Sequence, residues 1–275
     1  MEGKKLQKFS EYSMSTYLLC PRKYRYTYIE KPFKKQKRYV NVYFIFGNVM
    51  HITCKEFYEH RAEDRTLENL YNIFRNVWKR SGIRSFFNSR IEEKELGEKG
   101  LYMLSNFYNS FGQKVPYKME SYMENKVRDY ILFGRIDRID LSADGTLQIV
   151  DYKTTKYYDL VDENRDRKTI QLKLYACILY GLKFKVTSGS YYHFEDNKLD
   201  TIEFTEQSIN YLMEWFDEIV EDIRYDRFFE KKVGKHCEFC DFFKICQGKE
   251  EENYDNNLVL PSDELFITNM ENSNN

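Results

Sequence analysis

One stretch, residues 134–156, constrains the fold more than any other part of the chain. It reads GRIDRIDLSADGTLQIVDYKTTK, two short apolar strands around an Ala-Asp-Gly turn, with charged side chains where burial is expected. Side chains alternate along a strand, so Asp151 and Lys153 lie on the same face. Charges at such positions need a counter-charge or a bound cation.

The length of the turn decides whether Asp137 joins that face. A two-residue Asp-Gly turn pairs Ala143 with Thr146 and leaves Asp137 facing away from Asp151. A three-residue loop, with Gly145 left-handed in a bulge, places Asp137 directly opposite Asp151, about 5 Å away. Two carboxylates that close repel each other unless a cation lies between them, and Mg²⁺ prefers oxygen ligands. The three-residue loop therefore predicts a metal site.

The hairpin also has a second interpretation from its residues alone. Arg135 and Arg138 could pair with the acids, and the whole hairpin would then be an ion-paired surface.

The wider pattern resembles the PD-(D/E)XK nuclease superfamily, specifically its RecB-like exonuclease branch. The resemblance extends from about Ser10 to Gly248. The matching motifs, in order, are GNVMH with His51, GRID with Asp137, VDYK with Asp151 and Lys153, and QLKLY with Gln171 and Tyr175. It implies an α/β fold, a small mixed central sheet flanked by helices in a restriction-endonuclease-like core, with a helical N-terminal lobe.

The resemblance implies a metal centre and a catalytic lysine. His51, Asp137, Asp151 and the carbonyl of Tyr152 would hold Mg²⁺ or Mn²⁺. Lys153 would position or help to deprotonate the attacking water, and its ammonium would stabilise the negative transition state.

The resemblance extends to four further residues. Gln171 and Tyr175, one helical turn apart, would contact DNA or orient Lys153. Glu120 aligns loosely with an additional acid of this branch, and Glu124 is the alternative. At both glutamates we expect a solvated helical charge.

Four cysteines form a second candidate site. Cys237-x₂-Cys240-x₅-Cys246 lies near the C-terminus and Cys20 near the N-terminus. Four thiolates bind zinc or an iron–sulfur cluster, and their spacing does not choose between the two. The arrangement resembles the staple of AddB-type helicase–nucleases and CRISPR-associated RecB-like exonucleases, which holds a four-iron four-sulfur (4Fe–4S) cluster. That resemblance implies a structural cluster that clips the C-terminal segment to the first helix.

The chain reads as one nuclease domain, residues 1–248. Within it we expect a helical insertion at about 52–118, a catalytic core at about 119–204, and a C-terminal helix and cluster segment at 205–248. Residues 249–275 form an acidic, flexible tail. Ser13 or Ser15 is expected to cap the first helix, Gly47 to break an apolar segment before a helix, and Thr205 to cap the last long helix.

Charge and cysteine usage bear on partners and compartment. Lys and Arg outnumber acids in residues 1–40, and the run RKYRYTYIEKPFKKQKRY could follow a phosphate backbone while its rings stack on bases. A helix with a solvated basic face is the alternative. No stretch approaches a membrane span, and the N-terminus lacks an apolar run after its lysines. We expect a cytoplasmic protein in a reducing compartment.

Together these features predict a metal-dependent DNA exonuclease that acts on single strands or DNA ends. Recombination, repair and CRISPR spacer acquisition, with an integrase or recombination proteins as partners, all fit this activity. RNA as substrate stays open. The alternatives are a catalytically silent iron–sulfur DNA-binding module and a nuclease subunit of a larger complex.

Overall fold

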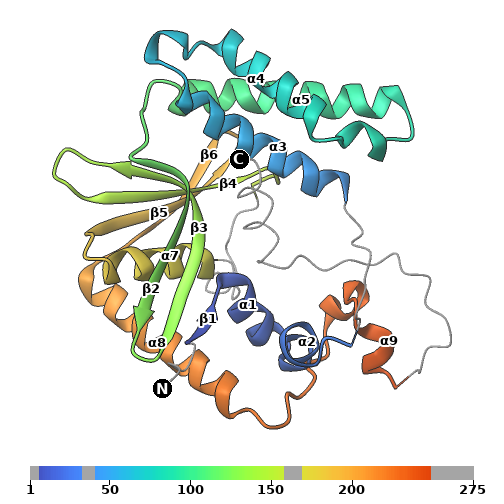
Figure 1. Cartoon of the computed structure of the whole chain (residues 1–275), viewed down its shortest axis with the longest axis vertical. Coiled ribbons are helices and arrows are strands. Elements are labelled where there is room, and N and C mark those ends of the chain that lie inside the picture. The colour runs from blue at the N-terminus through green and yellow to red at the C-terminus, as the bar shows by residue number, and fades with distance from the viewer. Residues whose placement is uncertain (1–5, 33–40, 158–168, 249–275) are drawn as a thin grey trace, which may run out of the picture. The chain divides into compact units, whose positions relative to one another are not determined.

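The computed structural model describes residues 6–32, 41–157 and 169–248 of the 275-residue chain. The described residues form two compact units. The larger consists of residues 6–8, 41–157 and 169–212, and the smaller of residues 9–32 and 213–248. The helices and strands are drawn in Figure 1.

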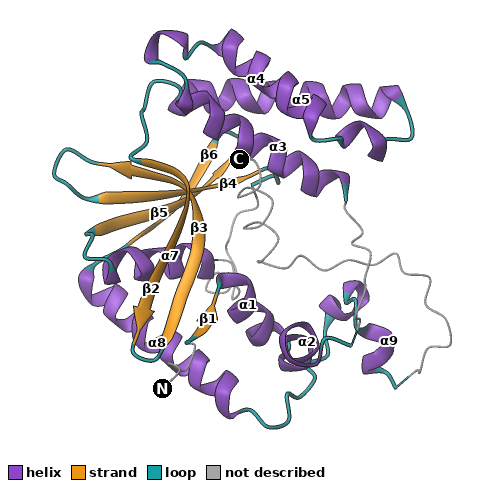
Figure 2. Cartoon of the chain, in the orientation of Figure 1, coloured by secondary structure: helices purple, strands orange, loops and turns teal. Residues whose placement is uncertain are grey.

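A six-stranded mixed sheet lies at the centre of the larger unit (Figure 2). Its order is β1-β3-β4-β5-β6, and β2 also pairs with β3. The β2–β3, β3–β4 and β5–β6 pairs are antiparallel, whereas β4 and β5 are parallel and are joined through helix α7. The strands are β1 (Gln7–Phe9), β2 (Lys118–Val127), β3 (Tyr130–Leu141), β4 (Leu147–Lys153), β5 (Val186–His193) and β6 (Lys198–Glu203).

The β3–β4 hairpin has the three-residue loop. The Ser142 amide donates to the Thr146 carbonyl at 2.9 Å, and Gly145 is left-handed with φ of 81°. The antiparallel register that follows, continued by one step, puts Asp137 opposite Asp151. The predicted turn is confirmed, and with it the shared face of the two carboxylates.

Strand β2 corrects one expectation. Glu120 and Glu124 were expected at solvated helical positions, but residues 118–127 pair with β3 along their length. The pairs on either side of Glu120 place it opposite Asp137, and Glu120 itself is left-handed, with φ of 43°. The polar sequence of β2 has little strand propensity of its own, so pairing with β3 decides its conformation.

Helices α3, α4 and α5 pack together on one face of the sheet (Figure 1). The shared core includes Phe57, Phe107 and Tyr152, all nearly or fully buried. Helix α3 corrects a second expectation, because it begins after the cap Asn41 and continues through Gly47 without a break. A glycine inside a helix costs only about 1 kcal/mol, which packing readily outweighs. The helices are α3 (Val42–Glu59), α4 (Leu67–Arg80) and α5 (Arg90–Phe111).

Helix α7 (Ile170–Gly181) covers the opposite face. A Cβ built on Gly189 in β5 would lie 3.2 Å from the Cβ of Leu172, so the glycine permits close approach of helix and sheet. The next residue along β5, Ser190, pairs with Val150 of the α3–α5 core. Successive residues of β5 therefore point to the two different helical layers.

The smaller unit joins the N-terminal helices to the segment after α8 (Glu206–Tyr225), which begins in the larger unit. Ser10, and neither Ser13 nor Ser15, is the first cap: it forms a capping box with Ser13. The predicted Thr205 cap of α8 is confirmed by its bond from the Ser208 amide at 3.1 Å. The remaining elements are α1 (Glu11–Leu19), α2 (Pro21–Tyr24), a π-helical turn (Arg25–Glu30), a 3₁₀ turn (Lys235–Phe239) and α9 (Phe243–Cys246).

The predicted fold class, a mixed central sheet flanked by helices, is confirmed. The proposed subdivision at 52–118, 119–204 and 205–248 stays a prediction, and the acidic tail at 249–275 lies outside the described residues. Within the described ranges, none of the helices combines the length and apolarity that crossing a membrane requires.

Candidate functional site

Three carboxylates lie in a row across three adjacent strands. The register places Glu120 of β2 opposite Asp137 of β3, and Asp137 opposite Asp151 of β4. The Glu120 and Asp137 side chains are each 9% exposed, and Asp151 is 2% exposed. Asp137 is also held in place by the Tyr152 amide, which donates to its Oδ2 at 2.7 Å. Burying three acids this close is unfavourable unless cations accompany them.

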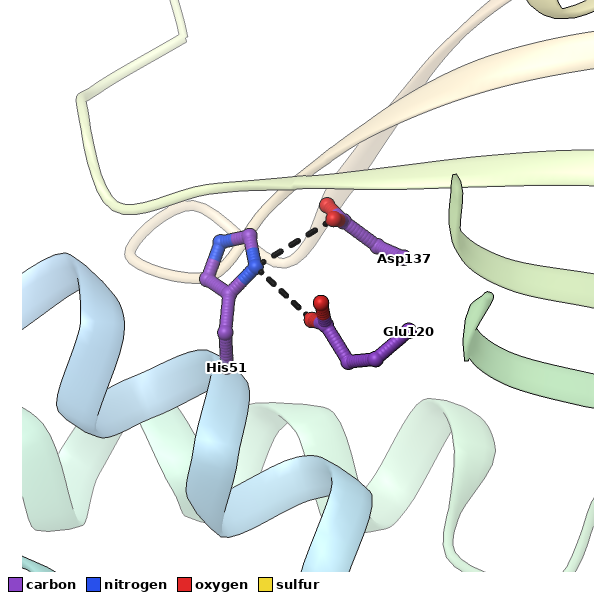
Figure 3. A group of neighbouring side chains, drawn as sticks. All are labelled: His51, Glu120 and Asp137. Carbon is purple, nitrogen blue, oxygen red and sulfur yellow. Dashed lines mark hydrogen bonds and ion pairs between the residues drawn. The ribbon is translucent and has the colours of Figure 1, made fainter. Parts of the chain in front are cut away.

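His51 reaches this row from α3. Its Nδ1 lies 3.2 Å from Glu120 Oε1 and 3.3 Å from Asp137 Oδ1, as Figure 3 shows. Its Nε2 lies 3.2 Å from the carbonyl oxygen of Tyr152. The ligand atoms of His51, Glu120 and Asp137 all lie within 4.8 Å of one another, close enough to bind a single metal ion.

The pKa values of His51 and Asp151 are both raised at this site. Burial alone lowers the pKa of His51, but the charges and hydrogen bonds of Asp137 and Glu120 outweigh it and raise that pKa well above its ordinary value. Burial raises the pKa of Asp151 to about 6, with Lys153 opposing the rise and Asp137 adding to it. Without a metal, burial therefore penalises the ionised form of Asp151.

The donor set fits a divalent cation. Asp151 Oδ2 is buried and forms an ion pair with Lys153 Nζ at 2.7 Å, and in the part of the chain that is described no further hydrogen-bond partner of this oxygen is found. A carboxylate oxygen with one ion-pair partner keeps lone-pair directions that a cation can use. Carboxylates, one imidazole and a nearby backbone carbonyl are ligands suited to Mg²⁺ or Mn²⁺.

Lys153 is held by a chain of hydrogen bonds from α7 to β3. Its Nζ donates to Gln171 Oε1 at 2.9 Å, Gln171 Nε2 donates to Tyr175 Oη at 3.0 Å, and Tyr175 Oη donates to the Arg135 carbonyl at 2.6 Å. Because the carbonyl can only accept, the tyrosine hydroxyl must accept from the amide nitrogen. The amide oxygen of Gln171 is thereby turned toward Lys153.

Two further features support the position of Lys153 and of its hydrogen-bond chain. Its ammonium lies 4.8 Å from the ring centroid of Tyr191, within cation–π range. Gly134 leaves room for Tyr175, since a Cβ at that position would lie 2.5 Å from Tyr175 Cε1. The glycine of the GRID motif therefore permits the tyrosine to reach the backbone of β3.

All of the predicted catalytic and metal residues lie at this site. His51, Asp137, Asp151, Tyr152 and Lys153 lie around the row of carboxylates, with Gln171 and Tyr175 behind Lys153. Their roles stay predictions.

Glu120, which the sequence supported only weakly, is a full member of the trio with His51 and Asp137. Glu124 instead forms an exposed pair with Lys8 at 2.6 Å. A signal for Glu120 was available in the two-residue turn Arg128-Asp129, which fixes the β2–β3 register.

The four predicted cysteine ligands lie together in the smaller unit. Cys20, Cys237, Cys240 and Cys246 line one cavity, along with basic and aromatic side chains. The Lys232 amide lies 3.5 Å from the Cys20 sulfur as a donor, and Lys232 Nζ donates to the Leu18 carbonyl at 3.2 Å. The C-terminal segment is thus fastened beside the N-terminal helices, as the cysteine pattern required.

Comparison with known proteins shows which family and which solved structures this chain is similar to. The family model described as the PD-(D/E)XK nuclease superfamily matches residues 8–247. A solved structure from Eubacterium rectale, named "Putative exonuclease", is 11% identical over 95% of this chain and 93% of its own, with a TM-score of 0.50. The crystal structure of SSO0001 is 16% identical over 90% and 89%, with a TM-score of 0.39. At such identities the likeness concerns the fold alone. No curated protein matches the sequence.

The two glutamates of β2 give a matched pair of variants. We expect Glu120→Gln to weaken Mn²⁺ binding by about tenfold or more, because it removes one charged ligand from the trio. Glu124→Gln, four residues along the same strand, should bind Mn²⁺ like the wild type. Titration calorimetry on both proteins checks this, and equal affinities would remove Glu120 from the site.

A second prediction concerns Gly134. Gly134→Ala should displace the Tyr175 ring, turn the Gln171 amide away from Lys153 and lower kcat by about tenfold to a hundredfold while Mn²⁺ affinity is kept. Gly97→Ala, at a helical glycine with no atom within 4 Å of a Cβ, is the control. Steady-state cleavage assays give kcat, and an unchanged kcat in Gly134→Ala would contradict the role of this hydrogen-bond chain.

The raised pKa of Asp151 predicts a stability effect in metal-free protein. The pKa of Asp151 is about 6 in the folded protein and about 4 in the unfolded chain, so ionising this acid lowers the free energy of unfolding. The penalty is absent below pH 4, develops between pH 4 and 6 and is complete above, at a size on the order of 1–3 kcal/mol.

Asp151→Asn should therefore unfold at a higher temperature than the wild type at pH 8 in EDTA, and the difference should shrink at pH 5. Glu203→Gln, at an exposed acid of β6, controls for the loss of one charge. Thermal melts by circular dichroism measure both, and a less stable Asp151→Asn protein at pH 8 would refute the prediction.

Proposed function

The chain belongs to the PD-(D/E)XK nuclease superfamily, and from that premise we propose that it is a RecB-like DNA exonuclease with a 4Fe–4S cluster. Membership makes it a nuclease that hydrolyses phosphodiester bonds with divalent metal ions. The observation that carries the proposal is the row of Glu120, Asp137 and Asp151, with His51 at one end and Lys153 at the other.

The metal would be held by this chain's own acids. Glu120, Asp137, Asp151 and His51 would supply its side-chain ligands, with the Tyr152 carbonyl beside them. When bound, the ion polarises the scissile phosphodiester and offsets the charge that builds on its oxygens. The Tyr152 amide keeps Asp137 oriented for this task through its 2.7 Å hydrogen bond.

Lys153 would act on the water and on the transition state. Its ammonium lies 2.7 Å from Asp151 Oδ2 and donates to Gln171. The Lys153 side chain is 34% exposed, so it can reach a substrate at the surface. From this place it would hold the attacking water by hydrogen bonding and stabilise the negative charge of the pentacovalent phosphorus. Gln171 and Tyr175 would act by orienting it.

DNA ends or single strands are the proposed substrate. The name of the Eubacterium rectale structure supports an exonuclease, and the basic, aromatic run near the N-terminus supports a single strand, although residues 33–40 lie outside the described chain. Both spacer acquisition and recombination would need such end trimming. The presence of Lys153 beside the acids favours catalysis over a silent binding module, which has no use for acids next to phosphate.

A cluster is proposed rather than zinc because of the cysteine pattern. The arrangement of Cys20 with Cys237, Cys240 and Cys246 resembles the staple of AddB-type helicase–nucleases and CRISPR-associated RecB-like exonucleases, which holds a 4Fe–4S cluster. The four cysteines line one cavity, as either metal group would need. Thiolates bind both zinc and iron–sulfur clusters.

The nuclease proposal is tested with end-labelled DNA and Mg²⁺ or Mn²⁺. We expect mononucleotides or short products from linear single strands, no cleavage of circular single strands, and no activity in Asp151→Ala at any metal concentration. Matched RNA strands test the choice of nucleic acid. Cleavage of the circles would show an endonuclease, and an active Asp151→Ala would reject the assigned site.

The cluster is tested by purification without oxygen. We expect brown protein that absorbs at about 400 nm and contains about four irons per chain. Cys20→Ala should lose the iron and unfold at lower temperature, whereas Cys177→Ala, at a buried thiol of α7, should keep the iron. Colourless protein with one tightly bound zinc would show that the four cysteines hold zinc instead of a cluster. Metal-free protein would reject the staple.

A further inference from the structure

A buried arginine lies next to the metal site on β3. Arg138 is 0% exposed, and its Nε donates to both carboxylate oxygens of Asp140, at 2.8 and 2.9 Å. Its Nη1 donates to Tyr58 Oη at 2.9 Å, and its Nη2 donates to the Lys114 carbonyl at 2.7 Å. The ring centroids of Tyr58 and Phe111 lie 5.1 and 4.7 Å from the guanidinium carbon.

These contacts join the elements that carry the metal-site side chains. Tyr58 is on α3, seven residues after His51, and residues seven apart lie on nearly the same side of a helix. Lys114 lies in the connection from α5 to β2, six residues before Glu120. Tyr58 Oη also donates to the carbonyl of Phe111, the last residue of α5, at 2.6 Å. Arg138 itself follows Asp137 directly.

We propose that Arg138 is a positioning residue that sets His51 and Glu120 at the right distance from Asp137. The inference rests on the proposed function, because it concerns the same metal centre. The guanidinium acts on the side chains of His51 and Glu120 through the elements that carry them. It fixes their elements, with α3 held through Tyr58, the approach to β2 held through Lys114, and both attached to β3.

Stability alone does not account for this arrangement. A buried ion pair contributes little net free energy of folding, and apolar replacements of similar volume are often neutral or stabilising. What the arginine provides, and an apolar side chain cannot, is a rigid planar fork with hydrogen bonds in three fixed directions. Four hydrogen bonds from one planar group, to β3 itself and to two other segments, define the angles between those segments.

The test uses variants that separate geometry from stability. Arg138→Met with Asp140→Asn removes the ion pair as a unit, so that no charge is left buried and alone. Tyr58→Phe keeps the ring beside the guanidinium and removes only the hydroxyl. Arg84→Met is the control, because Arg84 forms a 2.7 Å ion pair with Glu93 at the surface, with its side chain 70% exposed.

Two readouts do not depend on cleavage. Mn²⁺ affinity, measured by calorimetry without DNA, should fall about tenfold to a hundredfold in the double variant and about threefold to tenfold in Tyr58→Phe, in line with losses of supporting groups around metal ligands. In metal-free protein, amide hydrogen exchange of α3 between His51 and Tyr58 should be faster than in the wild type. In cleavage assays, kcat at limiting Mn²⁺ should fall and recover in part at saturating Mn²⁺, with KM for DNA unchanged.

The outcomes distinguish this inference from the nuclease proposal. If the wild type binds Mn²⁺ no better than Asp137→Ala does, the metal centre itself is rejected. If the wild type binds Mn²⁺ there and the double variant folds and binds it equally well, Arg138 has no positioning role. Should the double variant fail to fold, Tyr58→Phe decides the question, and unchanged Mn²⁺ affinity and α3 exchange in that variant would overturn the inference.

Discussion

The pairing register of β2, β3 and β4 is the constraint on which the site depends. Strand periodicity is two, so a slip of one residue in either pairing would turn a carboxylate to the other face of the sheet. The three-residue loop at Gly145 fixes one register, and the two-residue turn before Tyr130 fixes the other. Local turn geometry, far from the chemistry, therefore decides that Glu120, Asp137 and Asp151 meet.

Placing three acids side by side lowers the free energy of unfolding, and the surrounding groups offset only part of that loss. His51 and Lys153 lie at the two ends of the row, and the pKa of Asp151 is still raised, first by burial and then by the charge of Asp137. A site with this balance binds a divalent cation more favourably than a fully neutralised site would, because binding relieves the repulsion. The fold thus maintains an unfavourable arrangement that its cofactor can offset, a common feature of functional sites.

The β3–β4 hairpin and the shared face of Asp137, Asp151 and Lys153 could be predicted from sequence, because side-chain alternation and turn chemistry are local. The turn at Gly145 admitted two registers, and opposed acids needed the longer loop. Glu120 is harder to place from sequence, because β2 is polar and takes its conformation from β3, so its signal is the register set by the short Arg128-Asp129 turn; a left-handed glutamate has no sequence signature. Helix α3 continues through Gly47 for a similar reason, since tertiary packing outweighs a weak local preference.

Strand β3 is where the two supporting networks meet. On one side, Tyr175 donates to the Arg135 carbonyl and thereby orients Gln171 toward Lys153. On the other, Arg138 binds segments of α3 and of the approach to β2. Asp137 lies between these two anchor points, on a strand paired on both sides. A paired strand is among the least deformable elements of a fold, so anchoring both Lys153 and the row of carboxylates to it gives them one common frame of reference.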